Sequence, residues 1–189
     1  MLSVIIPTLN CERLLVATLS MLVPGAISGV VCQVLIVDGG STDATLEVAD
    51  AGGCEVAVSS APLAGRLRVA AAKARSPWLM FLRAGTVLEA TWLEETARFI
   101  EEAEPAGAGT AAVFRKSMSA RSTHRITAEV LALLKFALFG PHPDQGLLID
   151  ARLYNALGGH RETAPDPEAD LLARLGRRRI LMLHSGARR

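Results

Sequence analysis

Short apolar runs alternate along this chain with stretches that are apolar on one helical face only. The apolar runs have the length of buried strands, and we predict strands at residues 2–6, 32–37, 54–58, 78–82, 111–114, 146–149 and 180–183. The amphipathic stretches predict helices at 12–22, 67–74, 92–104, 122–139, 151–157 and 167–175, with one more between Thr42 and Gly52. This alternation indicates βαβ units, so the expected fold class is α/β, with a mostly parallel mixed sheet flanked by helices.

The ends of the first helix carry signals of their own. Asn10 precedes it and has the short polar side chain of a helix cap, and Pro24-Gly25 follows it and is expected to stop it. Further along, residues 105–109 have the composition of a flexible loop. We therefore expect a single domain over residues 1–189, which this loop divides into a half at 1–104 and a half at 110–189.

Composition narrows the class of protein. The chain has 189 residues, of which 50% are hydrophobic and 21% charged, which suits one globular core. A net charge of +1 provides no field that would attract nucleic acid. No apolar stretch reaches the roughly 18–20 residues of a membrane span, and no basic segment precedes the apolar N-terminus, which indicates a strand and not a signal peptide. Three cysteines without metal-ligand spacing fit a cytoplasmic protein.

Polar residues follow two of the predicted strands. Asp38 and Gly39 end the second strand, and Pro7 to Asn10 end the first. In open α/β sheets, ligands bind beyond the carboxyl ends of the strands. A carboxylate there can accept hydrogen bonds from ribose hydroxyls or from a base N–H. The alternative is an ordinary turn in which Asp43 begins a helix.

These segments resemble the nucleotide-sugar half of an inverting family 2 glycosyltransferase. The first reads Ser-Val-Ile-Ile-Pro-Thr-Leu-Asn at 3–10, and the second reads Val-Leu-Ile-Val-Asp-Gly-Gly-Ser-Thr-Asp at 34–43. Gly65-Arg66-Leu67-Arg68 is similar to an element of a small bacterial subgroup. Further segments that resemble the family lie at 144–149, 153–159, 168–175 and 185–189, so the likeness extends over essentially the whole chain.

The resemblance implies a Rossmann-like single domain of the GT-A type and a nucleotide-diphosphate sugar as donor. Carried over residue by residue, it implies a nucleotide site at Pro7, Thr8, Asn10, Asp38, Gly39 and Arg66, and an acceptor side at Asp144, Gln145 and Gly146. Acceptors in this family are often lipid-linked or belong to the cell envelope. A peripheral position at the inner face of the membrane is therefore an alternative to a purely cytoplasmic one.

The chain departs from the family at the metal motif. Where such enzymes carry Asp-x-Asp, this sequence has Arg83-Ala84-Gly85. The family implies Mg²⁺ or Mn²⁺ as cofactor, but these cations need oxygen ligands, so we predict no metal at residues 83–85. Two interpretations of Arg83 stay open. It could contact the diphosphate directly, since guanidinium pairs well with phosphate, or it could simply fill a lost site.

The resemblance also implies a carboxylate that acts as general base on the acceptor hydroxyl. By register, Glu168 takes that place, although a charged first helical turn is the alternative because acidic groups suit a helix N-terminus. His160 and His184 could touch diphosphate or metal, or serve the structure alone.

Two functions therefore remain, and whether the protein is an enzyme stays open. One is an active sugar transferase that inverts the sugar carbon. The other is a degenerate member that binds a nucleotide or a partner without turnover. A nucleotidyltransferase is a weaker third, because no Gly-rich phosphate loop lies near the N-terminus.

Overall fold

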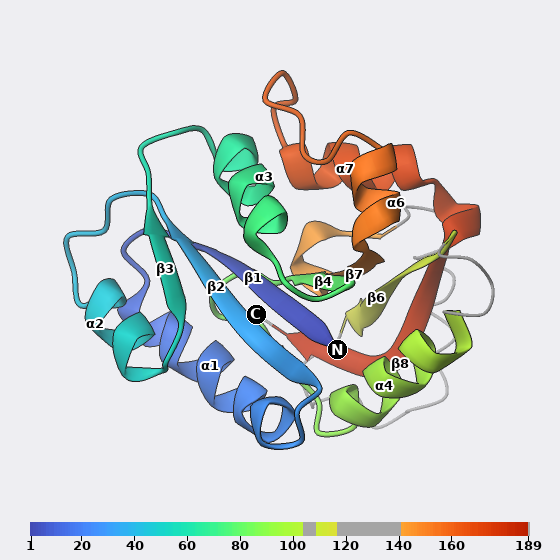
Figure 1. Ribbon diagram of the computed structural model, residues 1–189, viewed down its shortest axis with the longest axis horizontal. Helices are drawn as coiled ribbons and strands as arrows, with labels where there is room; N and C mark the ends of the chain where they lie inside the picture. The colour runs from blue at the N-terminus through green and yellow to red at the C-terminus, as the bar shows by residue number, and fades with distance from the viewer. Residues whose placement is uncertain (104–108, 117–140, 189) are drawn as a thin grey trace, which may run out of the picture.

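A computed structural model describes residues 1–103, 109–116 and 141–188. The helix predicted at 122–139 lies outside the described residues. The rest forms one twisted sheet with helices on both faces (Figure 1). Among the described helices, none is both long and apolar enough to cross a membrane.

The described strands form an eight-stranded sheet in the order β3-β2-β1-β4-β7-β6-β8-β5. The strands are β1 (Leu2–Thr8), β2 (Val31–Asp38), β3 (Glu55–Val58), β4 (Trp78–Phe81), β5 (Val87–Leu88), β6 (Ala111–Lys116), β7 (Leu147–Asp150) and β8 (Ile180–Arg188). β1 to β4 are parallel, whereas β7 runs antiparallel to both of its neighbours. The sheet is thus mixed and mostly parallel in its first half, as the sequence predicts.

The described helices cover the sheet in two groups, one to each face. They are α1 (Glu12–Ile27), α2 (Thr45–Ala51), α3 (Leu63–Lys73), α4 (Trp92–Ala103), α6 (Ala151–Ala156) and α7 (Pro167–Leu175), with 3-10 turns η1 (Pro143–Gln145) and η2 (Arg177–Arg179). In Figure 1, α1, α2 and α4 lie on one side, and α3, α6 and α7 lie on the other.

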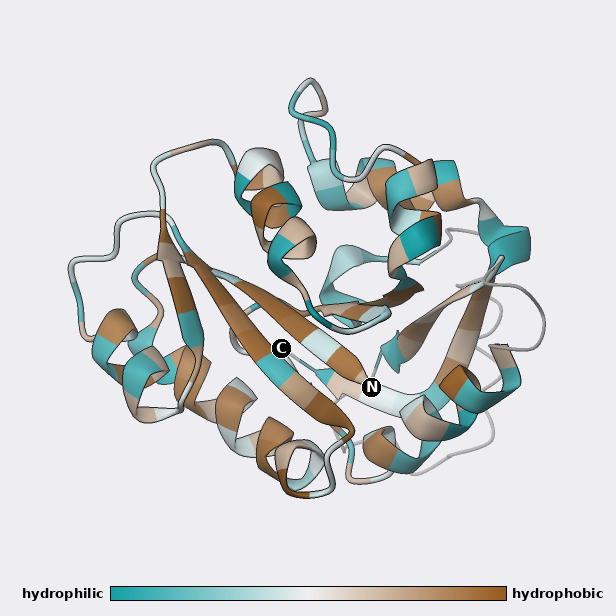
Figure 2. Ribbon diagram, in the orientation of Figure 1, coloured by the Kyte–Doolittle hydropathy of each residue, from teal (hydrophilic) through white to brown (hydrophobic). Residues whose placement is uncertain are grey.

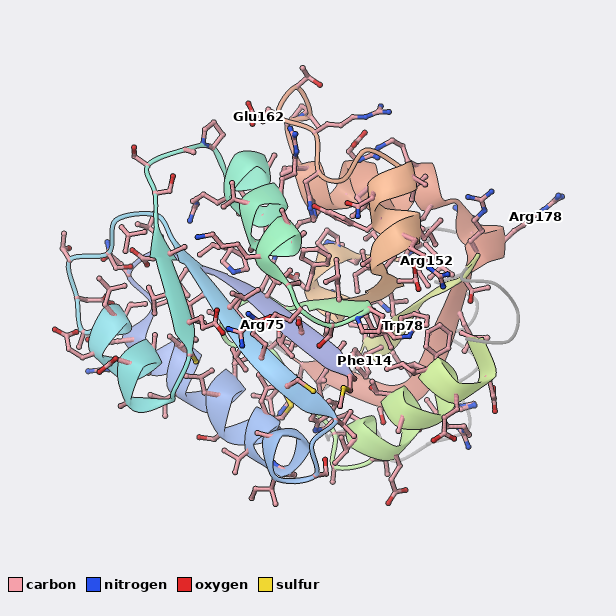
Figure 3. The ribbon with its side chains drawn as sticks, viewed as in Figure 1. Arg75, Trp78, Phe114, Arg152, Glu162 and Arg178 are labelled. Atoms are coloured by element: carbon pink, nitrogen blue, oxygen red, sulfur yellow. The ribbon has the colours of Figure 1, made fainter. Side chains whose placement is uncertain are left out.

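Successive side chains of each strand point to opposite faces of the sheet, so two hydrophobic cores form, one under each group of helices. Val4 and Ile6 of β1 join the cluster under α1, α2 and α4, whereas Ile5 joins the cluster under α3, α6 and α7. Strands buried on both faces are mostly apolar, and Figure 2 shows them largely in brown, with helices whose outer faces carry teal. Trp78 and Phe114 lie deep in this interior, while Arg178 extends outward (Figure 3).

The prediction that Pro24-Gly25 stops the first helix was wrong. α1 continues through Pro24 to Ile27. Tertiary packing explains this, because Gly25 is buried so closely that a Cβ there would lie 2.8 Å from Trp92 Cη2. Close contact with α4 therefore outweighs the local cost of a proline in the helix.

Several other boundaries also differ from those predicted. Asn10 does not cap α1, because its Oδ1 accepts a hydrogen bond from the Thr42 N–H at 2.8 Å. α3 begins at Leu63, ahead of the predicted start at 67, and β8 continues to Arg188 because it pairs with both β6 and the short, unpredicted β5. Helix and strand ends depend on such long-range partners.

The sheet places the two candidate nucleotide segments on one edge, as expected. Thr8 faces Asp38 in the parallel register of β1 and β2, so the loops after both strands leave the sheet side by side. β4 lies on the other side of β1, with Phe81 facing Ile5. Arg83 follows two residues later, so it leaves the sheet beside Pro7 on the same edge.

A buried hydroxyl on α1 holds the turn that carries Arg83. Thr18 Oγ1 accepts the Gly85 N–H at 2.9 Å and donates to the Thr86 carbonyl at 3.1 Å. Gly85 has φ +92°, a conformation that favours glycine. The turn is thus fixed to the helix below it.

Replacing Thr18 by valine tests this anchor. Thr18→Val keeps the shape of the side chain but leaves a buried N–H and a buried carbonyl without their partner, so we expect a loss of about 1–3 kcal/mol in the free energy of unfolding. Urea unfolding measures it. Thr18→Ser, which keeps the hydroxyl, should lose much less; equal losses in both variants would show that the hydroxyl does not anchor the turn.

Candidate functional site

Asp38 organises the loop at the end of β2. Its Oδ1 accepts hydrogen bonds from Thr8 Oγ1 at 2.8 Å and Ser41 Oγ at 2.5 Å, and its Oδ2 accepts the N–H groups of Gly40 at 2.8 Å and Ser41 at 2.6 Å. Burial by itself would raise the pKa of Asp38, but these hydrogen bonds outweigh it and hold the pKa below its ordinary 3.8. The carboxylate is therefore ionised, and both of its oxygens are hydrogen-bonded within the protein.

The loops after β1 and β2 are also joined to each other. Asn10 donates its backbone N–H to Ser41 Oγ at 2.8 Å, and its side chain accepts from Thr42. Asn10 has φ +48°, a left-handed conformation that asparagine tolerates better than most residues. Ser41 and Thr42 lie in the segment that resembles the family but were not among the predicted site residues, although hydroxyl residues after Asp-Gly-Gly are typical of such turns.

Arg66 reaches this edge from α3. Its Nη1 donates to the carbonyls of Val37 at 2.9 Å and Thr8 at 3.3 Å, and its Nε donates to Ala61. The guanidinium covers Gly39 so closely that a Cβ at that position would lie 3.0 Å from Nη1. The structure thus brings Thr8, Gly39 and Arg66 together, and Arg66 places a positive charge at the ends of the strands.

Direct contact between Asp38 and a nucleotide stays a prediction. Asp38 is 0% exposed, and each of its oxygens already accepts two hydrogen bonds. Pro7 is half-buried and Asn10 is exposed, so side chains and backbone around the carboxylate form the accessible surface of the loop.

Arg83 binds three carboxylates from the second half of the chain. Its Nε and Nη2 both donate to Glu168 Oε2, at 2.7 and 2.5 Å, and its Nη1 donates to Asp144 Oδ1 at 3.0 Å. Nη2 also lies 4.0 Å from Asp166 Oδ2. η1 carries Asp144 and the start of α7 carries Asp166 and Glu168, so the guanidinium joins both to the end of β4.

Glu168 is positioned by its own helix as well as by Arg83. Asp166 caps α7 by accepting the Glu168 N–H at 3.1 Å, which fixes the first helical turn. Burial raises the pKa of Glu168 above its ordinary 4.5, and the hydrogen bond and charge of Arg83 offset only part of that rise. Within the described residues no hydrogen bond to Oε1 is found, so one carboxylate oxygen is held and the other is available.

Residues 83 and 85, where the resemblance predicts metal-binding carboxylates, do not fit a divalent cation. Arg83 brings a positive charge there, and Gly85 has no side chain. Its φ of +92° would strain an aspartate at that position. Across the part of the chain that the structure describes, no group of three His, Cys, Asp or Glu side chains is arranged to hold a metal. We therefore derive no chemical step through a metal at residues 83–85.

The other acceptor-side candidates are buried behind Asp144. Gln145 donates Nε2–H to the Phe114 carbonyl at 2.8 Å and accepts the His142 N–H at 2.6 Å. Gly146 has φ +73°, and a Cβ there would lie 2.7 Å from Leu82 Cδ2. Of the three predicted residues, the structure brings only Asp144 to Arg83.

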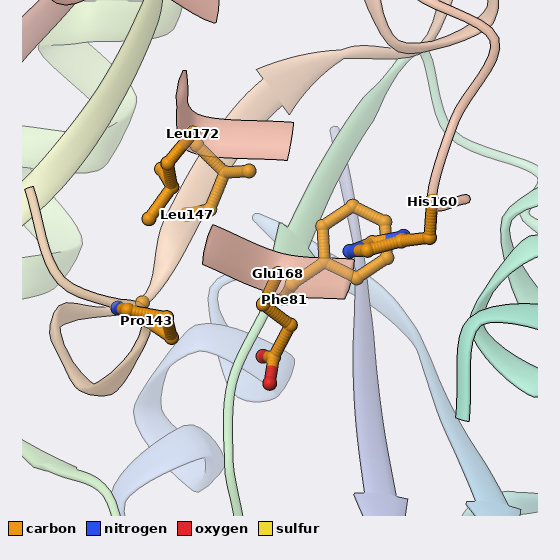
Figure 4. Close-up of a pocket in the computed structure, with 7 residues that line it drawn as sticks. Phe81, Pro143, Leu147, His160, Glu168 and Leu172 are labelled. Carbon is orange, nitrogen blue, oxygen red and sulfur yellow. The ribbon is translucent and has the colours of Figure 1, made fainter. Parts of the chain in front are cut away.

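A small pocket opens beside Glu168 (Figure 4). It is lined by Phe81, Pro143, Gly146, Leu147, His160, Glu168 and Leu172. His160 is 1% exposed, and its Nδ1 lies 2.8 Å from the Tyr154 hydroxyl. Burial lowers the pKa of His160 to about 4, so its ring is neutral and brings no positive charge for a diphosphate. His184 is exposed on β8.

Comparisons with known proteins bear on the whole arrangement. A family model described as Glycosyl transferase family 2 matches residues 3–181. No curated protein matches the chain. Among solved structures, glucosyl-3-phosphoglycerate synthase from Mycobacterium tuberculosis, in complex with Mn²⁺ and UDP-glucose, has a TM-score of 0.69 at 19% identity, covering 97% of this chain and 68% of that one.

A second solved structure is similar over nearly the whole chain. TarS 1-349 from S. aureus has a TM-score of 0.72 at 18% identity, covering 99% of this chain and 59% of that one. At such identities the likeness shows the fold, which is the GT-A fold expected from the sequence.

Replacing Asp38 by asparagine tests its role in the loop. An amide cannot accept all four hydrogen bonds, so Asp38→Asn should lower the free energy of unfolding at neutral pH by about 1–3 kcal/mol. Because the folded pKa lies below 3.8, the stabilisation is fully present above pH 3.8 and is lost as the pH falls through the folded value. The two proteins should therefore converge in acid. Urea unfolding across pH checks this, with exposed Asp50→Asn as control; a constant difference at every pH would contradict it.

Proposed function

This chain belongs to glycosyl transferase family 2, and we propose that it transfers a sugar from a nucleoside-diphosphate sugar to an acceptor hydroxyl, with inversion at the sugar carbon. The observation that carries the proposal is the placement of Glu168. Its buried carboxylate is held through one oxygen by Arg83 on the edge of the sheet where the nucleotide segments also end.

In the proposed reaction, Glu168 acts as general base. Oε1 would take the proton of the acceptor hydroxyl while that oxygen attacks the sugar carbon, and the nucleoside diphosphate would leave from the opposite face. A carboxylate whose pKa is raised by burial is a stronger base, which suits this role. Asp144 would face the acceptor from η1.

The nucleotide would bind over the loops after β1 and β2. Their accessible surface includes Pro7, Asn10 and the backbone around Gly39, with Asp38 beneath, and Arg66 supplies positive charge. Two solved relatives of the same fold are complexes with UDP or UDP-glucose, so UDP is the first probe, while the base, the sugar and the acceptor stay open. We keep a cytoplasmic location, with or without a lipid-linked acceptor at the membrane, as part of this proposal.

The second candidate is a nucleotide- or partner-binding protein without turnover. It is favoured by the carboxylates around Arg83, because Glu168 and Asp144 already bind the guanidinium that a diphosphate would need. A donor panel decides between them. UDP-, GDP-, ADP-, CDP- and dTDP-sugars are incubated with the protein and release of nucleoside diphosphate is measured; binding without any release would favour the second candidate.

The conservative variant Glu168→Gln tests whether Glu168 is the general base. It keeps the shape of the side chain but cannot take a proton, so we expect the turnover number to fall by about 10²–10⁴-fold while the nucleoside diphosphate still binds, at least as tightly as to the unmodified protein. Steady-state kinetics and calorimetry provide the two readouts. Glu47→Gln, at an exposed position on α2, is the matched control; full turnover by Glu168→Gln would remove Glu168 from the chemistry.

Metal removal tests the departure at residues 83–85. Since a guanidinium stands there in place of two carboxylates, we expect turnover to survive chelation by EDTA and to change little when Mn²⁺ is restored. Initial rates with EDTA, Mg²⁺ and Mn²⁺ check this. A rate that vanishes in EDTA and returns with Mn²⁺ would mean that a metal binds through ligands other than those predicted.

A further inference from the structure

Arg83 lies between the acceptor-side carboxylates and the edge where the diphosphate would bind, and its positive charge suits both. On one side it holds Glu168 and Asp144, and on the other it follows β4 beside Pro7, on the edge where the nucleotide would bind. We propose that Arg83 is a positioning residue that holds Glu168 in the free protein and passes to the donor's diphosphate on binding, which releases the carboxylate to act as base. This inference rests on the proposed function.

The geometry of the contact makes such an exchange possible. Nε and Nη2 of Arg83 both donate to a single oxygen, Glu168 Oε2, whereas Nη1 alone donates to Asp144. The same two nitrogens form a fork that matches two oxygens of a phosphate. Nη1 can stay on Asp144 while the fork turns, and the side chain of Arg83 is 23% exposed, so part of it is already accessible.

The charges favour exchange over simple addition. Asp144, Asp166 and Glu168 bring three carboxylates within 4.0 Å of the Arg83 guanidinium. A diphosphate that approached these carboxylates directly would be repelled. With the guanidinium turned toward it, the diphosphate gains a charge-assisted contact, and the cation stands between it and the carboxylates.

Exchange would change the proton affinity of Glu168. The charged groups that face it are Arg83, which favours the ionised carboxylate, and Asp144 and Asp166, which disfavour it; the His160 ring in the adjoining pocket wall is neutral. Arg83 is the one of these that lowers the pKa of Glu168. When its fork turns to the diphosphate, Arg83 opposes burial and the two aspartates less, and the carboxyl becomes a stronger base at the moment the donor is in place.

The test is a pH titration of Glu168 by NMR. The protein is labelled with ¹³C at glutamate Cδ, and the Glu168 signal is assigned by its absence from Glu168→Gln. We expect the diphosphate that binds among UDP, GDP, ADP, CDP and dTDP to move the Glu168 midpoint upward by about one to three pH units, the usual effect of losing one close opposite charge. The matching nucleoside, which lacks phosphate, should leave the midpoint unchanged.

Variants of Arg83 provide the second part of the titration experiment. Arg83→Gln should raise the midpoint without any ligand, and the diphosphate should then move it much less than in the unmodified protein. Arg83→Lys keeps the charge but not the fork, so it should give an intermediate midpoint and a smaller response. If Arg83→Gln fails to fold, the titration of the unmodified protein still decides.

The outcomes separate this inference from the function on which it rests. A diphosphate that binds and leaves the Glu168 midpoint in place would overturn the exchange alone. An equal upward shift with the bare nucleoside would overturn it too, because burial by the base would then be the cause. If no diphosphate in the panel binds, both the proposed function and the exchange are overturned.

Discussion

The Arg83 guanidinium joins the two halves of the site. It comes from the end of β4, in the first half of the chain, and its ion pairs with Asp144 and Glu168 reach into the second. Without it, buried Glu168 would lose the guanidinium that binds it, and a buried unpaired charge is costly. The arrangement also explains why a cation can stand at residue 83, where the resemblance predicts a metal-binding carboxylate, since Asp144 from η1 and Glu168 from α7 bind it.

The edge proposed to bind the nucleotide is held in a different way. Its order comes from hydrogen bonds within the loops, above all those that Asp38 receives from Thr8, Gly40 and Ser41. Arg66 closes the same edge by bonding the carbonyls of Thr8 and Val37. The polar groups nearest the strand ends are thus largely paired with each other, which gives a preformed surface on which a nucleotide could bind with little reordering.

The fold was predictable because apolar runs of strand length alternate with amphipathic helices, and the central strands are buried on both faces. The shared edge of Thr8 and Asp38 followed from the parallel order alone. Helix limits were less predictable: α1 passes through Pro24 because Gly25 packs against Trp92, and Asn10 bonds Thr42 and not its own helix. Glu168 could be singled out by resemblance and register, but its pairing with Arg83, 85 residues earlier in the chain, could not, because no local pattern encodes a contact at that separation.

The most direct measurement is a crystal structure of the protein with its nucleoside diphosphate bound. The account predicts a guanidinium nitrogen of Arg83 at hydrogen-bond distance, about 2.7–3.2 Å, from a phosphate oxygen, with Glu168 Oε2 no longer bonded to it. A metal ion coordinated between the diphosphate and residues 83–85, or a diphosphate bound while Arg83 still holds Glu168, would contradict it.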